Sequence, residues 1–140
     1  MSLKHAIGLT SALFLSLSLL SGIAEAGKGG GHVTTTGSGS LSQVLLDSTD
    51  GLAHFGQHAT YTLTTTLTYP YVNQKCYVNG VLVSNDWRGF FPGSLSTQTF
   101  TLGGSQLWQS GAADCTAYLD MANGRSGWTQ LSSMSFHVDA

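Results

Sequence analysis

The clearest pattern in the chain is an alternation of apolar or aromatic residues with threonines in ATYTLTTTLTY, residues 59–69. Tyr61, Leu63 and Leu67 fall on one face of an extended chain, and most of the threonines fall on the other. Because threonine and tyrosine both favour strands, this segment is predicted to be a β-strand with one buried and one solvated face. Pro70 has no backbone N–H for a sheet, so we expect it to limit the far end of this strand.

A β-hairpin is predicted around Asn79-Gly80, which separates the apolar runs YVNQKCYV and VLVSND. Type I′ turns need positive φ at both central residues, and Asn-Gly meets that need best. The segment WRGFFPGSLS that follows the second run is predicted to be a loop.

Four further strands are expected, at 41–49, 97–102, 113–121 and from Trp128 to the C-terminus. In the last of these, Met134 and Phe136 share a face but Leu131 falls out of phase, which predicts a β-bulge. No segment shows sustained helical periodicity. Seven strands with regular turn signals predict an all-β, seven-stranded antiparallel sandwich.

The first 26 residues have the order of a secretory signal peptide: Lys4 and His5, an apolar stretch, then Ala24-Glu25-Ala26. We expect a signal-peptide helix at 1–26, cleaved after Ala26. An uncleaved anchor is the alternative, but serine, threonine and glycine interrupt the apolar stretch. Residues 27–40 are rich in glycine, serine and threonine and predict a flexible leader to one domain at 41–140. A secreted, extracellular protein without membrane insertion after cleavage is expected, with the periplasm as the alternative address.

Cys76 and Cys115 are the two cysteines of the chain. An exported protein meets oxidising conditions, in which two cysteines normally pair. Neither the CxxC spacing typical of redox sites nor a zinc-ligand cluster is present. Each cysteine alternates with small, aliphatic or amide neighbours, as a buried strand residue would. We therefore predict a structural Cys76–Cys115 disulfide and no free thiol.

Charge is sparse, and this narrows the class of partner. The formal net charge is −2, with five lysine and arginine residues in the whole chain. Five cations are too few to contact a phosphate backbone along its length or to bind an anionic membrane surface. We therefore do not expect nucleic acid as a partner.

The strand layout over roughly 41–140 resembles the immunoglobulin-like superfamily as found in secreted bacterial proteins. The resemblance is carried by the CYVNGVLV hairpin, the FTL strand, Trp108 and GAADCTAYL, in which Cys115 stands on the penultimate strand. Two features depart from antibody-type domains: Cys76 falls on the third predicted strand, and Ala113 occupies the tyrosine-corner position. The resemblance implies the architecture and a bridge between neighbouring strands of one sheet, but no function.

A metal site is conceivable from Asp47, Asp50, His54 and His58. The alternative, a polar loop, is preferred because zinc and calcium signatures are absent. No Ser-His-acid arrangement, G-x-S-x-G elbow or carboxylate pair stands out, so we expect neither catalysis nor a cofactor.

Aromatic residues outside the predicted core are the remaining candidates for binding. The ligand-binding candidates are Tyr71, Trp87, Arg88 and Trp108. Aromatic rings with one wet edge are common in interfaces. The alternative is that Trp108 and one of the adjacent phenylalanines, Phe90 or Phe91, plug the ends of the sandwich, and this is favoured for Trp108. The sequence thus predicts a non-catalytic module that binds an extracellular protein or, as the alternative, a polysaccharide through loop aromatics.

Overall fold

The computed structural model describes residues 32–35, 39–124 and 127–140. In these ranges the chain is all-β, and no helix there is long and apolar enough to cross a membrane. The signal-peptide helix expected at 1–26 lies outside the described residues, as do residues 27–31 and 36–38 of the expected leader. The strands are β1 (His32–Thr35), β2 (Gly39–Leu45), β3 (His58–Thr65), β4 (Pro70–Val78), β5 (Val81–Gly89), β6 (Phe100–Thr101), β7 (Ala113–Ala122) and β8 (Trp128–Val138).

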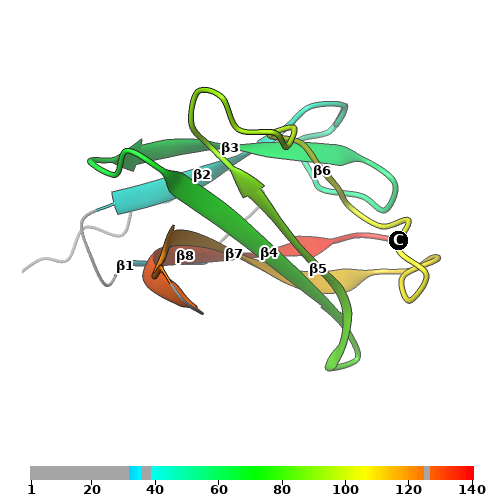
Figure 1. Cartoon of the computed structure of the whole chain (residues 1–140). Coiled ribbons are helices and arrows are strands. Elements are labelled where there is room, and N and C mark those ends of the chain that lie inside the picture. Colours follow the sequence, from blue (N-terminus) through cyan, green and yellow to red (C-terminus); the bar gives the residue numbers. More distant parts are fainter. Residues whose placement is uncertain (1–31, 36–38, 125–126) are drawn as a thin grey trace, which may run out of the picture.

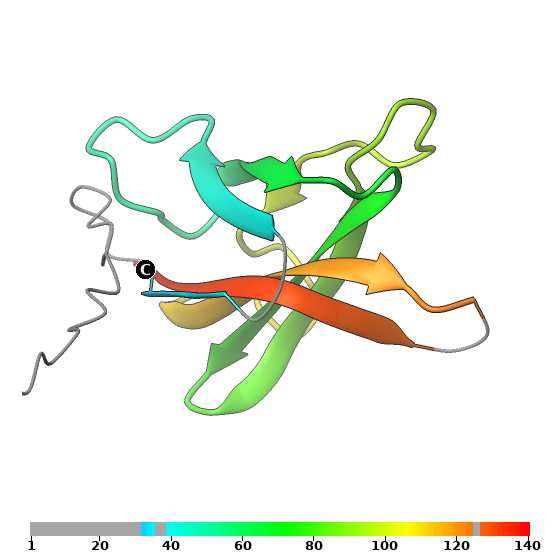
Figure 2. The same cartoon turned by 90° about the vertical axis from the view of Figure 1, so that its left-hand side faces the viewer.

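The strands form two antiparallel sheets that lie face to face (Figures 1 and 2). The larger sheet has the order β1-β8-β7-β4-β5, and the smaller has the order β2-β3-β6. Figure 1 shows the small sheet lying over one face of the large one. The predicted all-β class with two packed antiparallel sheets is confirmed.

The core lies between the sheets and follows from the alternation of side chains along each strand. The large sheet contributes fully buried residues such as Val72, Ala117 and Leu119. The small sheet contributes Tyr61 and Phe100, whose rings meet edge to face at 5.5 Å. The threonines on the opposite side of β3 are half or fully exposed, as predicted.

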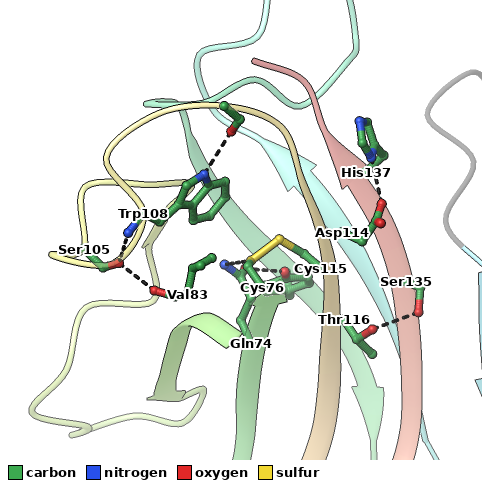
Figure 3. The surroundings of a disulfide bond; sticks show 12 residues. Gln74, Cys76, Val83, Ser105, Trp108, Asp114, Cys115, Thr116, Ser135 and His137 are labelled. Carbon is green, nitrogen blue, oxygen red and sulfur yellow. Dashed lines mark hydrogen bonds and ion pairs between the residues drawn. A yellow bond between two sulfur atoms is a disulfide. The ribbon is translucent and has the colours of Figure 1, made fainter. Parts of the chain in front are cut away.

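Cys76 and Cys115 form the predicted disulfide, with Cα atoms 4.0 Å apart (Figure 3). The two residues are direct partners in the register of the neighbouring strands β4 and β7. Both are buried on the inner face, and neither cysteine of the chain is free. The bridge closes a sequence separation of 39 residues. By the chain-entropy model, a loop of that size stabilises the fold by about 4 kcal/mol.

A polar contact crosses the core beside the disulfide. The Tyr61 hydroxyl donates to Gln74 Oε1 at 2.7 Å, and Gln74 Nε2 lies 3.8 Å from Cys76 Sγ (Figure 3 shows the latter contact). Gln74 is only 1% exposed, so its amide depends on these partners. Complete burial raises the pKa of Tyr61 and keeps its hydroxyl a neutral donor.

Two local predictions are confirmed. Asn79 and Gly80 have φ of 49° and 79°, the double positive φ of a type I′ turn between β4 and β5. The register of β7 with β8 shifts where Leu119 pairs with Ser132 and Asp120 pairs with Gln130. Leu131 is therefore the extra residue of a bulge and packs partly buried against the core.

Several expected boundaries differ from the structure. The expected flexible leader contributes β1, which pairs with β8, and the first residues of β2. Its valine and threonines favour strands, and the edge of β8 offers unpaired backbone groups. Strand β3 ends at Thr65, well before Pro70, and β6 is two residues long. Strand β5 continues through Gly89, because Tyr71–Asn73 of β4 supply partners for residues expected in a loop.

Candidate functional site

A polar trough lies on the outer face of the large sheet, on the opposite side from the disulfide. Its volume is about 560 Å³. It is lined by Asn73, Lys75, Asn85, Trp87, Tyr118, Asp120, Trp128 and Gln130. We call these residues the trough.

Strand alternation places these side chains together. On β4, Asn73 and Lys75 alternate with the inward-facing Gln74 and Cys76. Antiparallel register then brings partners from both sides: Asn73 stands between Trp87 of β5 and Tyr118 of β7. The row of Trp87, Asn73 and Tyr118 is thus set by the β4–β5 and β4–β7 pairings, the second of which also aligns the cysteines.

Two of the trough residues, Trp87 and Trp128, pack with a third aromatic ring, Tyr71, at the side of the trough. Tyr71, Trp87 and Trp128 come from β4, β5 and β8, and we call them the aromatic rim. The Tyr71 ring centroid lies 5.8 Å from that of Trp87 and 5.0 Å from that of Trp128. The two indoles lie 6.0 Å apart and are tilted by 51°. Trp87 is 52% and Trp128 43% exposed, so each ring is supported on one side and open to solvent on another.

The floor of the trough carries a buried carboxylate. Asp120 is 5% exposed and accepts a hydrogen bond from Asn73 Nδ2. Burial raises the pKa of Asp120, while the Asn73 hydrogen bond and the charge of Lys75 oppose that rise. Lys75 Nζ lies 5.7 Å from the centroid of the Tyr118 ring, a cation–π contact. The floor therefore offers both acceptors and donors beside apolar ring faces.

Of the four ligand-binding candidates, the structure brings Tyr71 and Trp87 together and separates Arg88 and Trp108 from them. Arg88 alternates to the opposite side of β5, where its Nη1 donates to Asp86 Oδ1 and the guanidinium lies 5.4 Å from the Phe100 ring centroid. Trp108 is 1% exposed, and its Nε1–H donates to the Gly111 carbonyl at 2.9 Å (Figure 3). Trp108 is thus a core residue, the alternative favoured for it from the sequence.

The four residues of the conceivable metal site form two separate pairs. His58 Nδ1 lies 2.8 Å from Asp47 Oδ2, and His54 Nε2 lies 2.8 Å from Asp50 Oδ2. Asp50 also accepts a hydrogen bond from the Leu52 N–H. This hydrogen bond, together with the one to His54, lowers the pKa of Asp50 to about 2. In the described part of the chain, no group of three or more histidine, cysteine, aspartate or glutamate side chains is placed to hold a metal ion. The two pairs fasten the loop between β2 and β3.

Sequence reasoning missed most of the trough. The sequence predicts Trp128 at the start of the last strand but does not indicate that its ring meets Tyr71 and Trp87. The polar residues Asn73 and Lys75 are not among the predicted binding residues, although they alternate with the buried cysteine face. Two features of the sequence could have found them. The residues that alternate with the buried ones must face outward, and the cysteine pair fixes which outward residues of β4 and β7 are neighbours.

Comparisons with protein-family models, with curated proteins and with solved structures found no match.

Proposed function

We propose that this chain is an exported, non-catalytic carbohydrate-binding module, and that the trough with its aromatic rim is the glycan site. The observation that carries the proposal is the juxtaposition of two half-exposed indoles with a floor of amide, carboxylate and ammonium groups. Sugar rings present C–H faces that stack on aromatic side chains and hydroxyl groups that need donors and acceptors at their edges. The trough offers both kinds of contact within one hollow.

The balance of charge in the trough favours a neutral glycan. Among the described residues that line it, Lys75 and Asp120 are the only ionisable side chains apart from the Tyr118 phenol, and their formal charges cancel. The Lys75 ammonium also faces the Tyr118 ring, which reduces its availability to an anionic ligand. An acidic polysaccharide would bring its charge close to the Asp120 carboxylate.

The immunoglobulin-like architecture and export belong to the same proposal. In the lettering of such a domain, β8, β7, β4 and β5 take the places of strands G, F, C and the strand after C. The facing strands β2, β3 and β6 take the places of A, B and E, and β1 is added at one edge of the larger sheet. A buried disulfide is typical of proteins outside the cytoplasm. Both features support a secreted or periplasmic binding domain.

A protein partner is the second candidate, and one observation favours it. The exposed side chains of Tyr69, which packs on Phe91, and of Leu95, which lines a hollow with Phe91, extend the apolar surface beyond the trough. Aromatic residues are enriched at protein interfaces. A protein would cover both regions, whereas a short glycan would need only the trough.

Retention on insoluble polysaccharides and cell-wall material tests the proposal. We expect the protein to be retained on at least one of them and to be released by the matching soluble sugar. Trp87→Ala should abolish retention. Leu107→Ala is the matched control, because Leu107 is 75% exposed and lies outside the trough. Absence of retention on the whole panel would contradict the glycan proposal and leave a protein partner, sought by pull-down, as the alternative.

A further inference from the structure

A second hollow adjoins the trough and shares its aromatic wall. Its volume is about 440 Å³, and its apolar lining comes from Tyr71, Trp87, Phe91 and Leu95. Tyr71 touches Trp87 at 5.8 Å and Phe91 at 5.3 Å between ring centroids. Since Trp87 lines both hollows, the polar trough and the apolar hollow meet at this ring.

The loop that forms this second hollow is fixed against β5. The Gly89 N–H donates to Ser96 Oγ at 3.1 Å, and the Ser94 N–H donates to the Phe91 carbonyl at 3.2 Å. A Cβ on residue 89 would stand 2.5 Å from Ser94 Oγ and 2.7 Å from the Phe91 ring. The loop can therefore pack this closely against β5 only because residue 89 is glycine. The hollow is therefore built by specific contacts within the loop and with β5.

Leu95 marks the apolar character of this hollow. Its side chain is as exposed as in an extended peptide, at 106%, although the neighbouring serines of the loop are half-buried. A leucine in that position contributes nothing to the core, whereas it would bury its side chain against an apolar ligand.

We propose that the natural ligand is a glycan that carries an alkyl or acyl substituent, with the sugar in the trough and the substituent in the hollow beside Leu95. This inference rests on the proposed glycan site and names its ligand class. Because Trp87 lines both hollows, a group attached directly to a sugar in the trough can reach the apolar hollow. A substituent on a soluble or polymeric glycan fits better than a lipid in a bilayer, because Lys75 is the only cation among the described residues that line either hollow.

Paired methyl and octyl glycosides of glucose, galactose and maltose test the inference by calorimetry on the exported protein, below the micelle concentration. For at least one sugar, the octyl form should bind about tenfold or more tightly than the methyl form, because the chain adds buried apolar surface. Leu95→Ser should remove much of that difference and leave methyl glycoside binding unchanged. Leu107→Ser is the matched control and should change neither affinity.

The outcomes separate this inference from the proposed function. Equal affinity for methyl and octyl forms would overturn the inference alone, whereas failure of all the glycosides to bind would contradict the glycan site and the inference together. Binding of octanol as tight as that of the octyl glycosides would show apolar adsorption without sugar recognition. Binding to glycolipid vesicles but to no soluble octyl glycoside would replace the substituted glycan by a membrane ligand.

Discussion

The indoles of Trp87 and Trp128 lie 6.0 Å apart although their strands, β5 and β8, are separated in the sheet by β4 and β7. The Tyr71 ring on β4 contacts both indoles, so the three rings form a triangle. The three rings thus join β8 to β4 and β5, two strands with which β8 shares no backbone hydrogen bonds. This relationship defines the rim that we propose as the sugar platform.

Trp128→Ala should weaken glycan binding about as much as Trp87→Ala. Buried aromatic anchors at binding sites typically cost 2 kcal/mol or more on truncation, which is about 30-fold in Kd. Calorimetric titration with the glycan found by the retention panel measures this effect, and circular dichroism confirms that the variant is folded. Unchanged affinity of Trp128→Ala would confine the platform to Trp87 and Tyr71.

The disulfide should contribute stability but no binding. The double variant Cys76→Ala/Cys115→Ala removes a cross-link that closes a separation of 39 residues. We expect the free energy of unfolding to fall by about 2–4 kcal/mol, measured by urea denaturation. Because both cysteines face the core and the trough lies on the other face, the folded fraction should keep its glycan affinity. Loss of affinity in fully folded protein would contradict this separation of roles.

Tyr61→Phe should destabilise the protein by about 1–3 kcal/mol, because it leaves Gln74 Oε1 buried without its donor. The double variant Tyr61→Phe/Gln74→Met replaces both polar partners by apolar groups and should recover part of the loss. Urea denaturation of the wild type, both single variants and the double variant gives the coupling energy. Additive effects in this cycle would mean that the two side chains do not depend on each other.

The loop between β2 and β3 should loosen in acid. The folded-state pKa of Asp50 is lowered from 3.8 to about 2, so between these values the unfolded chain binds more protons than the folded one. The stabilisation by Asp50 is therefore present above pH 4 and is lost as the pH falls toward 2. Hydrogen exchange of the Leu52 amide, which donates to Asp50, should accelerate relative to the core over this range. In Asp50→Asn the same pH change should have a smaller effect.

The sequence predicted the features that depend on local pattern. Alternation located the seven main strands, Asn79-Gly80 predicted the turn, and the phase of Leu131 predicted the bulge. The cysteine pairing was predicted from the expected export of the chain and from the alternation that places each cysteine on the buried face of its strand. These predictions succeeded because each depends on residues close in sequence or on a single covalent link.

The site could be predicted only in part, because it depends on register across four strands. Tyr71 and Trp87 stand out in the sequence as aromatic residues. Their contact with Trp128 requires the Trp128 side chain of β8 to extend over β7, which lies between β8 and β4. Arg88 follows Trp87 in sequence, yet the period of two along β5 turns it to the opposite side. Trp87 was expected in a loop, because strand length depends on partners in β4 that the sequence of β5 does not contain.

The three tryptophans of this chain provide the most direct test of the glycan site. Their indole N–H signals can be followed by NMR during titration with the retained glycan, after assignment with single Trp→Phe variants. The account predicts that the signals of Trp87 and Trp128 shift in a saturable way. The buried Trp108, whose N–H is held by Gly111, should keep its position and serve as the internal control. Saturable binding that leaves the Trp87 and Trp128 signals unmoved would contradict the assignment of the trough as the glycan site.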